Sequence, residues 1–188
     1  MSKQNNKINI GSIINITLRL FVVCTVIAAV VAGVYTLTYE KIAENEQKVI
    51  DTTIRSVFPT GIIEKMEYAG ESTVNSIYAI KNEDDDSIAG YSVICAPKGF
   101  GGEIRMLVAF DSDKKINAVR IMSHSETPGI GDKISSEDHK TFTDQFKSKT
   151  GELVFGKDGI DKITGSSKSS NAVLKGVNDA VTAVNSVN

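Results

Sequence analysis

Tryptophan is absent from the sequence, cysteine occurs only twice, and aromatic residues make up 6% of the 188 residues. Two cysteines are too few for a disulfide scaffold, an iron–sulfur cluster or a structural zinc site. The scarcity of aromatic side chains argues against a stacking platform for single-stranded nucleic acid. The 21 basic and 23 acidic residues give a net charge of −2, which excludes a strongly basic nucleic-acid binder. We therefore expect no nucleic-acid partner.

The sequence signatures of several common catalytic sites are also missing. There is no Walker A loop, no G-x-G-x-x-G fingerprint and no G-x-S-x-G elbow. His124 and His139 are the two histidines, and no set of metal ligands surrounds them in the sequence, so we expect no catalytic metal. The acidic triplet Asp84–Asp86 has no further oxygen ligands at a defined spacing, and a solvated hairpin tip explains it better than a cation site.

Charge is absent from one long apolar stretch. Residues 20–39 contain no charged side chain, and a helix of this length spans roughly 30 Å, the thickness of a hydrocarbon core. A cleaved signal peptide would have a shorter apolar region and a clear small-residue cleavage site, and an uncharged run this long argues against a buried soluble helix. We predict a single transmembrane helix over residues 20–39.

The charges on either side of this stretch differ in sign. Lys3, Lys7 and Arg19 are the charged residues before Glu40, and every acidic residue lies at or beyond Glu40. Cytoplasmic flanks of membrane helices are enriched in basic residues, so we expect residues 1–19 to be cytoplasmic. Residues 40–188 would then form an extracytoplasmic domain of a single-pass protein in the cell membrane.

The pattern beyond the apolar stretch begins as a helix and then changes to strands. Residues 40–58 carry apolar side chains at helical spacing, which predicts an amphipathic helix that stops before Pro59. Between residues 75 and 123, short β-rich runs are separated by charged turns at Asn82–Ser87 and Asp111–Lys115. The candidate strands are Asn75–Lys81, Ile88–Ala96, Glu103–Phe110 and Ile116–Ser123. Because short turns join successive strands, we predict an antiparallel meander.

Two helices are predicted after the strands. Ser135–Asp138 resembles a capping box ahead of Phe142 and Phe146, which form an i,i+4 pair. The last helix is expected to start after the serine cluster Ser166–Ser170. Its apolar stripe consists of Val173, Val177, Ala180, Val181 and Val184. The fold class is therefore α+β: an antiparallel sheet with flanking helices, preceded by one N-terminal transmembrane helix. Cys24 falls in the span and Cys95 at a strand end, so the two cysteines should not meet.

A hydroxyl-rich loop, Asp161–Ser170, leads into the last predicted helix. Free backbone N–H groups and the helix dipole favour an anion at such a position, and Lys168 adds positive charge. A phosphate group would suit this loop. The same residues also fit an ordinary serine N-cap beside a flexible loop, because short Gly/Ser loops are common.

Two other segments contain glycines that allow unusual backbone conformations. His124–Lys133, with Pro128, Gly129 and Gly131, follows a candidate strand and precedes a helix, where backbone can approach a ligand. Alternatively, it is simply a strand-to-helix loop. Gly99–Gly102 lies between two candidate strands, and its ordinary explanation is a hairpin bulge.

Together these motifs resemble the FMN-binding domain family found in the G subunit of the Rnf complex and the C subunit of the sodium-pumping NADH:quinone reductase. The flavinylation pattern of that family is Asp, two residues, Ser or Thr, Gly, Ala or Ser, Thr or Ser, any residue, and Ser or Thr. This sequence matches the pattern at Asp161, Thr164, Gly165, Ser166, Ser167 and Ser169. The run Glu126–Lys133 is similar to the corresponding run of the Rnf G subunit.

The resemblance implies a covalently bound FMN. In this family a dedicated transferase links FMN through its phosphate to the hydroxyl in the fourth position of the core motif, which is Ser167 here in place of the usual threonine. Ser166 is then a competing acceptor, and Ser169 and Ser170 would cap the helix below the phosphate. The other implied cofactor-binding residues are Thr164, Gly165, Lys168, Glu126, Thr127, Pro128, Gly129, Ile130 and Gly131.

The function that the resemblance implies is electron relay. The chain would be a membrane-anchored subunit of an Rnf-type ion-translocating ferredoxin:NAD oxidoreductase complex, without independent catalysis. Its partners would be the other integral and peripheral subunits and, during maturation, the flavin transferase. The alternatives are a subunit of a sodium-translocating NADH:quinone reductase, a stand-alone extracytoplasmic flavoprotein for extracellular electron transfer, and a non-redox binding module at the membrane surface.

Overall fold

The computed structural model describes residues 10–70, 73–135, 140–157 and 159–187. The chain divides into two compact units, residues 1–48 and 49–188. Helix α1 (Ile10–Arg55) begins in the first unit and ends in the second. Its apolar stretch is long enough and apolar enough to cross a membrane, and the side chains of that stretch are exposed. The predicted membrane segment is therefore confirmed as a candidate span.

Several polar groups within the apolar stretch are satisfied by the helix itself. The hydroxyl of Thr25 donates to the Phe21 carbonyl at 2.8 Å, and that of Thr36 donates to the Gly33 carbonyl at 2.9 Å. A hydroxyl bonded to its own helix costs less to place in hydrocarbon than a free one. These two threonines therefore fit a lipid environment.

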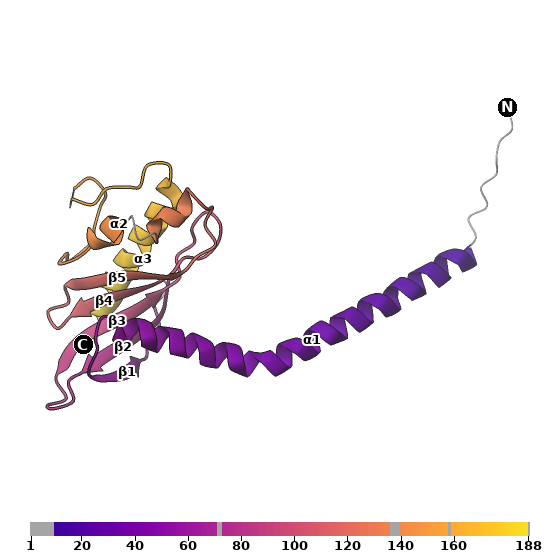
Figure 1. Cartoon of the computed structure of the whole chain (residues 1–188), viewed down its shortest axis with the longest axis horizontal. Helices are drawn as coiled ribbons and strands as arrows, with labels where there is room; N and C mark the ends of the chain where they lie inside the picture. Colours follow the sequence, from indigo (N-terminus) through magenta and orange to yellow (C-terminus); the bar gives the residue numbers. More distant parts are fainter. Residues whose placement is uncertain (1–9, 71–72, 136–139, 158, 188) are drawn as a thin grey trace. The chain divides into compact units, whose positions relative to one another are not determined.

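The second unit is built on one antiparallel sheet (Figure 1). Its strands are β1 (Ile62–Met66), β2 (Val74–Lys81), β3 (Ile88–Cys95), β4 (Arg105–Asp111) and β5 (Ile116–Ser123), in the order β1-β2-β3-β4-β5. The four predicted strands are confirmed to within two residues at each end, and so is the meander. The edge strand β1 was not predicted from the sequence.

The predicted turns form between these strands. In the β2–β3 turn, a side-chain oxygen of Asp85 accepts hydrogen bonds from the backbone N–H and the hydroxyl of Ser87. In the β4–β5 turn, the side chain of Asp111 accepts from the N–H of Lys115 at 2.9 Å, and Lys114 has a φ of 61°. These short side-chain bonds replace the ladder bonds that the chain gives up where it reverses direction.

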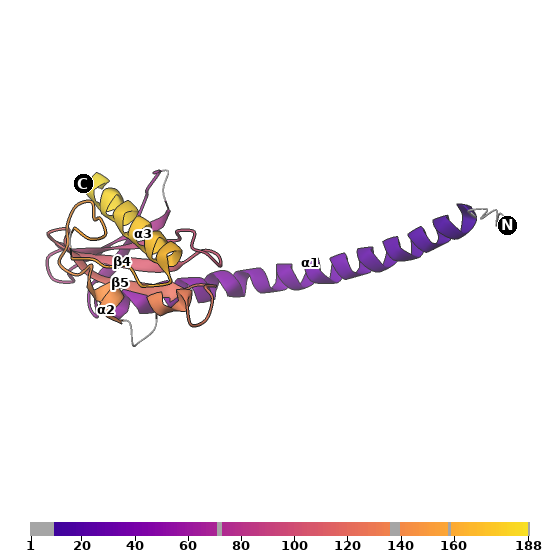
Figure 2. The same ribbon diagram turned by 90° about the horizontal axis from the view of Figure 1, so that it is seen from above.

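Helix α3 (Ser167–Ser186) covers one face of the sheet and packs against β2, β3 and β4 (Figure 2). The predicted apolar stripe of this helix is confirmed as buried. It contacts side chains that alternate along the strands and point to this face, among them Ile77, Val93 and Val108. This cluster is the main core of the domain.

The opposite face of the sheet packs against the end of α1. Ile50 and Ile54 are buried there together with Tyr78, Ile94 and Leu107, among others. The predicted amphipathic helix over residues 40–58 is confirmed only in part. The helix ends at Arg55, and Ile42 and Val49 are about half exposed, so only its last two turns contribute to this core.

Among its described residues, the segment between β5 and α3 holds two short helices, η1 (Gly131–Ile134) and α2 (Lys140–Asp144). The rings of Phe142 and Phe146 are both buried and meet edge to face with centroids 5.7 Å apart, as the predicted i,i+4 pair requires. Only Phe142 lies in the helix, which is five residues long. Most of the predicted capping box, residues 136–138, lies outside the described residues.

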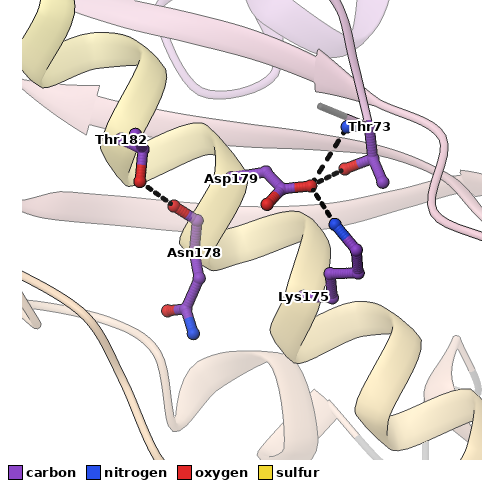
Figure 3. Close-up of polar contacts among 5 residues, drawn as sticks. All are labelled: Thr73, Lys175, Asn178, Asp179 and Thr182. Carbon is purple, nitrogen blue, oxygen red and sulfur yellow. Dashed lines mark hydrogen bonds and ion pairs between the residues drawn. The ribbon is translucent and has the colours of Figure 1, made fainter. Parts of the chain in front are cut away.

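Two neighbouring residues of α3, Asn178 and Asp179, fix loops on either side of the helix, and Figure 3 shows the contacts of Asp179 with Thr73 and Lys175. A carboxylate oxygen of Asp179 accepts from the N–H and the hydroxyl of Thr73, ahead of β2, and from the Lys175 ammonium at 2.7 Å. The Asn178 amide exchanges two 2.9 Å hydrogen bonds with the backbone of Leu153. The helix is therefore held in place by polar contacts as well as by its apolar stripe.

The two cysteines are free, as expected. Cys95 is fully buried in the main core, and burial raises the pKa of its thiol far above the ordinary range. A buried, protonated thiol is a weak nucleophile, so Cys95 acts as a small apolar core residue.

Candidate functional site

Three segments that are far apart in the sequence meet at one pocket of about 220 Å³. They are the glycine-rich turn Gly99–Gly102, the loop that follows β5, and the hydroxyl-rich loop with the first turn of α3. The pocket is lined by Phe100, Glu126, Thr127, Ile130, Gly131, Gly165, Ser166, Lys168 and Ser169. All three segments singled out in the sequence therefore contribute to a single site.

The side chain of Glu126 connects the three segments. One carboxylate oxygen accepts hydrogen bonds from the N–H groups of Phe100 at 2.8 Å and Gly101 at 3.1 Å. The other accepts from the hydroxyl of Ser169 in α3 at 2.6 Å. Glu126 is 6% exposed, so these donors replace the water that a carboxylate would otherwise require.

The glycines beside Glu126 leave room for this carboxylate. A Cβ atom on Gly99 would lie 2.1 Å from one oxygen of Glu126, and a Cβ on Gly131 would lie 2.6 Å from the other. Both distances are far below van der Waals contact, so any larger residue would displace the carboxylate. The glycine spacing in these two segments is thus explained by close packing around Glu126.

The two serines at the start of α3 differ in burial. Ser166, at the N-cap position, is 3% exposed, and its hydroxyl donates a short hydrogen bond to the Ile130 carbonyl. Ser167 is the first helical residue, and its side chain is exposed. Adjacent hydroxyls therefore differ sharply in access: Ser166 is enclosed and bonded, whereas Ser167 faces solvent.

The last helix was expected to start after Ser170, with Ser169 and Ser170 capping it, and this expected start is wrong. Helix α3 begins at Ser167, so both residues lie within its first turn and are buried. The Ser169 hydroxyl donates to Glu126, and the Ser170 hydroxyl accepts from the N–H of Ile163 at 3.2 Å. Their role is to connect the helix to the two loops on either side of it.

The electrostatic field at the pocket has three sources: a carboxylate, an ammonium group and the dipole of helix α3. The carboxylate of Glu126 lies at the wall, and the exposed Lys168 ammonium lies over the ring of Phe100, 5.3 Å from its centroid. The first N–H groups of a helix lack acceptors within it, and a 20-residue helix has a positive N-terminal dipole end. An anion is favoured at the exposed side of this turn.

The remaining predicted site residues lie around the pocket without lining it. They are Asp161 and Thr164 before α3, Ser167 and Ser170 in its first turn, and Pro128 and Gly129 in the loop after β5. Thr164 and Asp161 are exposed, and the N–H of Asp161 donates to the side chain of Gln145 at 2.6 Å. The carbonyl of Thr127 accepts from the N–H groups of Ile130 and Gly131, which closes the turn that contains Pro128.

Phe100 lines the pocket and was not predicted as a site residue. The glycines around it were noted as a motif, and an aromatic side chain between them was the available signal. A larger cavity of about 680 Å³ lies beside β1 and the start of β2, lined by residues such as Lys65, Tyr68 and Asn75. None of the described residues that line it belongs to the three motifs, so the smaller pocket is the better candidate for the functional site.

Residues 99–182, which include all three pocket segments, match the FMN-binding domain family. Residues 1–57, which include α1, match the RnfG N-terminal region. The first match covers the candidate site, and the second covers the candidate membrane span.

Whole-chain relatives identify the family more closely. The chain is 31% identical over 186 residues to the G subunit of the ion-translocating oxidoreductase complex of Aliivibrio fischeri, covering 89% of this chain and 87% of that protein. It is also 31% identical over 180 residues to the G subunit of the proton-translocating ferredoxin:NAD(+) oxidoreductase complex of Clostridium ljungdahlii, covering 93% and 92%. The chain therefore belongs to the family of G subunits of ion-translocating oxidoreductase complexes, the Rnf complexes, which confirms the resemblance.

Among solved structures, the crystal structure of Shewanella oneidensis NqrC is similar to this chain with a TM-score of 0.43 and 22% identity. The similarity covers 55% of this chain and 53% of that chain.

Proposed function

We propose that this chain carries FMN esterified through its phosphate to Ser167 and relays electrons within an Rnf-type complex. The observation that supports Ser167 most directly is the difference between adjacent hydroxyls. Ser167 is exposed at the first position of α3, whereas the Ser166 hydroxyl is buried and donates to the Ile130 carbonyl. A modifying enzyme must reach its acceptor oxygen, so Ser167 is favoured over Ser166.

The surroundings of Ser167 suit a phosphoester. The helix dipole and the N–H groups of the first turn favour a negative charge there, and Lys168 supplies an ammonium group from the next residue. Gly165, with a φ of 81° and open space where a Cβ would lie, leaves the approach to this turn unobstructed. Serine has the hydroxyl oxygen that the ester bond requires, although threonine is usual in the family.

The pocket beside Ser167 fits a flavin by the chemistry of its lining. The exposed apolar side chains Phe100 and Ile130 can contact an aromatic ring, and the backbone around Gly131 can approach a ligand closely. FMN supplies redox chemistry that no side chain of this protein provides. The protein residues attach the group, orient it and limit its contact with water. Covalent attachment prevents loss of a cofactor that could not be replaced outside the cytoplasm.

Family membership supports the proposed partners. The Clostridium ljungdahlii relative is named as a subunit of a proton-translocating ferredoxin:NAD(+) oxidoreductase complex. We propose that this chain occupies the corresponding place, passing electrons between other integral and peripheral subunits. A flavin transferase would act on it during maturation.

The arrangement in the membrane is also a proposal. The segment before the candidate span carries basic residues, and the acidic residues all follow it. The positive-inside rule then favours residues 1–19 in the cytoplasm and the flavin domain, residues 40–188, outside.

The test is mass spectrometry of the tryptic peptide of residues 163–168, from the full chain purified from cells that contain the transferase. The expected mass increase is that of FMN less one water, with fragment ions placing it on Ser167. Ser167→Ala should remove the increase, whereas Ser166→Ala, the matched control, should keep it. Ser167→Thr should also keep it. An unmodified wild-type peptide, or modification that persists in Ser167→Ala, would refute the assignment.

A further inference from the structure

The side chain of Phe100 is unusually exposed for a phenylalanine of this domain. The described phenylalanines of the domain are otherwise buried or half-buried, whereas Phe100 is 69% exposed. Exposure of an aromatic ring forgoes the stabilisation that burial would give. Its position at the rim of the pocket suggests a ligand that covers it.

The backbone beneath this exposed ring is fixed. The N–H groups of Phe100 and Gly101 donate to the buried carboxylate of Glu126, and the N–H of Gly99 donates to the Gly102 carbonyl at 2.7 Å. A Cβ on Gly101 would lie 2.0 Å from the Ser125 carbonyl oxygen, so the turn is packed tightly against the next loop. An apolar ring on a preorganised turn is suited to binding, because little conformational entropy is lost when a ligand stacks on it.

The face of Phe100 is within reach of the first turn of α3. The Lys168 ammonium already lies 5.3 Å from the centroid of the ring. Lys168 directly follows Ser167, and the ribityl chain of FMN is five carbons long. A planar group attached at Ser167 can therefore reach the same ring face, and the phosphate offers the ammonium of Lys168 another partner.

We propose that Phe100 is the platform on which the isoalloxazine ring of the attached flavin stacks, with Ile130 as the second apolar contact. This inference rests on the proposed attachment of FMN at Ser167. Phe100 and Ile130 are 69% and 51% exposed and both line the pocket, so together they present an apolar surface to a planar aromatic ligand.

The test uses a quencher placed at this position in the flavin-loaded full chain. Tryptophan in van der Waals contact with an excited flavin quenches its fluorescence by electron transfer, whereas phenylalanine is too difficult to oxidise. Phe100→Trp should lose most of the flavin fluorescence per bound flavin and regain it on denaturation. The matched control is Ile62→Trp, at an exposed position on β1 that does not line the pocket, and it should fluoresce like the wild type. In Phe100→Leu, iodide should quench the flavin more strongly than in the wild type.

Flavin content is measured in the same samples from the mass of the peptide of residues 163–168. Flavin on that peptide, together with equal fluorescence of Phe100→Trp and Ile62→Trp, would overturn the stacking inference and leave the proposed function standing. Equal iodide quenching of the wild type and Phe100→Leu would also overturn it. A wild-type peptide without flavin would overturn the proposed function and this inference with it.

Discussion

Among single residues, Glu126 has the largest structural role at the site. Its buried carboxylate accepts hydrogen bonds from two backbone N–H groups of the glycine-rich turn and from the hydroxyl of Ser169. The sequence motif marked Glu126 as a contact to the flavin. The structure shows in addition that this residue joins the segments from which the pocket is built.

Glu126→Ala is expected to lower the free energy of unfolding by about 3 kcal/mol, because it leaves three donors near the pocket without their acceptor. Glu126→Gln keeps an acceptor for the backbone N–H groups and should cost about 1 kcal/mol. Urea unfolding of the detergent-solubilised full chain measures both values. Glu152→Ala, at an exposed position, is the control and should change stability by less than about 0.5 kcal/mol. Equal effects of Glu126→Ala and Glu152→Ala would contradict this role.

Asp179 gives the domain a stability that depends on pH. Burial alone would raise the pKa of Asp179, but hydrogen bonds from Lys175 and Thr73 outweigh burial and hold that pKa below its usual value. The folded state therefore binds the proton more weakly than the unfolded state. The resulting stabilisation is fully present above the unfolded pKa of about 3.9 and is lost as the pH falls through the lower folded pKa.

Asp179→Asn is accordingly expected to be less stable than the wild type at pH 7, and the difference should shrink as the pH falls below about 4. The measurement is the free energy of unfolding of both proteins across this range. The asparagine amide would keep an acceptor for Thr73 but lose the charge that pairs with Lys175. The comparison therefore measures how much the negative charge of Asp179 contributes to the free energy of unfolding. A difference that stays constant from pH 7 to acid would contradict the prediction.

Among the elements, the central strands were predictable and the edge strand was not. Strands β2, β3 and β4 contain runs of buried apolar residues between charged turns, a pattern that sequence alone displays. Strand β1 has no fully buried residue, and its Glu64 and Lys65 resemble a loop. Its strand conformation comes from pairing with β2, including an ion pair between Glu64 and Lys81, and this long-range partner is not visible in a local pattern.

The start of α3 shows a similar limit. Four of the five residues from Ser166 to Ser170 are serines, and serines favour positions just outside a helix, so the sequence predicted a later start. Ser169 and Ser170 are instead accommodated within the helix because Glu126 and the N–H of Ile163 bond to them. The motif located the pocket correctly, but which hydroxyl is buried and which is exposed depends on contacts with distant loops.

The end of α1 is expected to behave as part of the domain core. Ile54 is fully buried against the second face of the sheet, whereas Val49 is 50% exposed. Ile54→Ala should lower the free energy of unfolding by about 2–5 kcal/mol, because it removes buried methyl groups and leaves a cavity. Val49→Ala, earlier in the same helix, should cost less than about 1 kcal/mol. Thermal or urea unfolding distinguishes the two, and similar losses at both positions would contradict the assignment of residues 50–55 to the core.

For the whole molecule, the distribution of charge and of cysteine makes membrane orientation measurable. Basic residues precede the candidate span and acidic residues follow it, which favours a flavin domain outside the cytoplasm. Cys95 is buried with a raised pKa, so it should not react with a thiol reagent in the folded protein. Replacement of Cys24 by alanine then gives a background in which an introduced cysteine reports its own side of the membrane.

In that background, Asp84→Cys at the exposed tip of the β2–β3 turn should react with a membrane-impermeant maleimide in intact protoplasts. Ser2→Cys, which precedes the span in the sequence, should react only after the membrane is permeabilised. The physical reason is the cost of moving Lys3, Lys7 and Arg19 across the bilayer during insertion, which favours keeping them in the cytoplasm. Labelling is read by the mass shift of the chain, and the Cys24→Ala background without an added cysteine is the blank. Labelling of Ser2→Cys in intact protoplasts, with Asp84→Cys protected, would show the opposite orientation and would place the flavin domain in the cytoplasm.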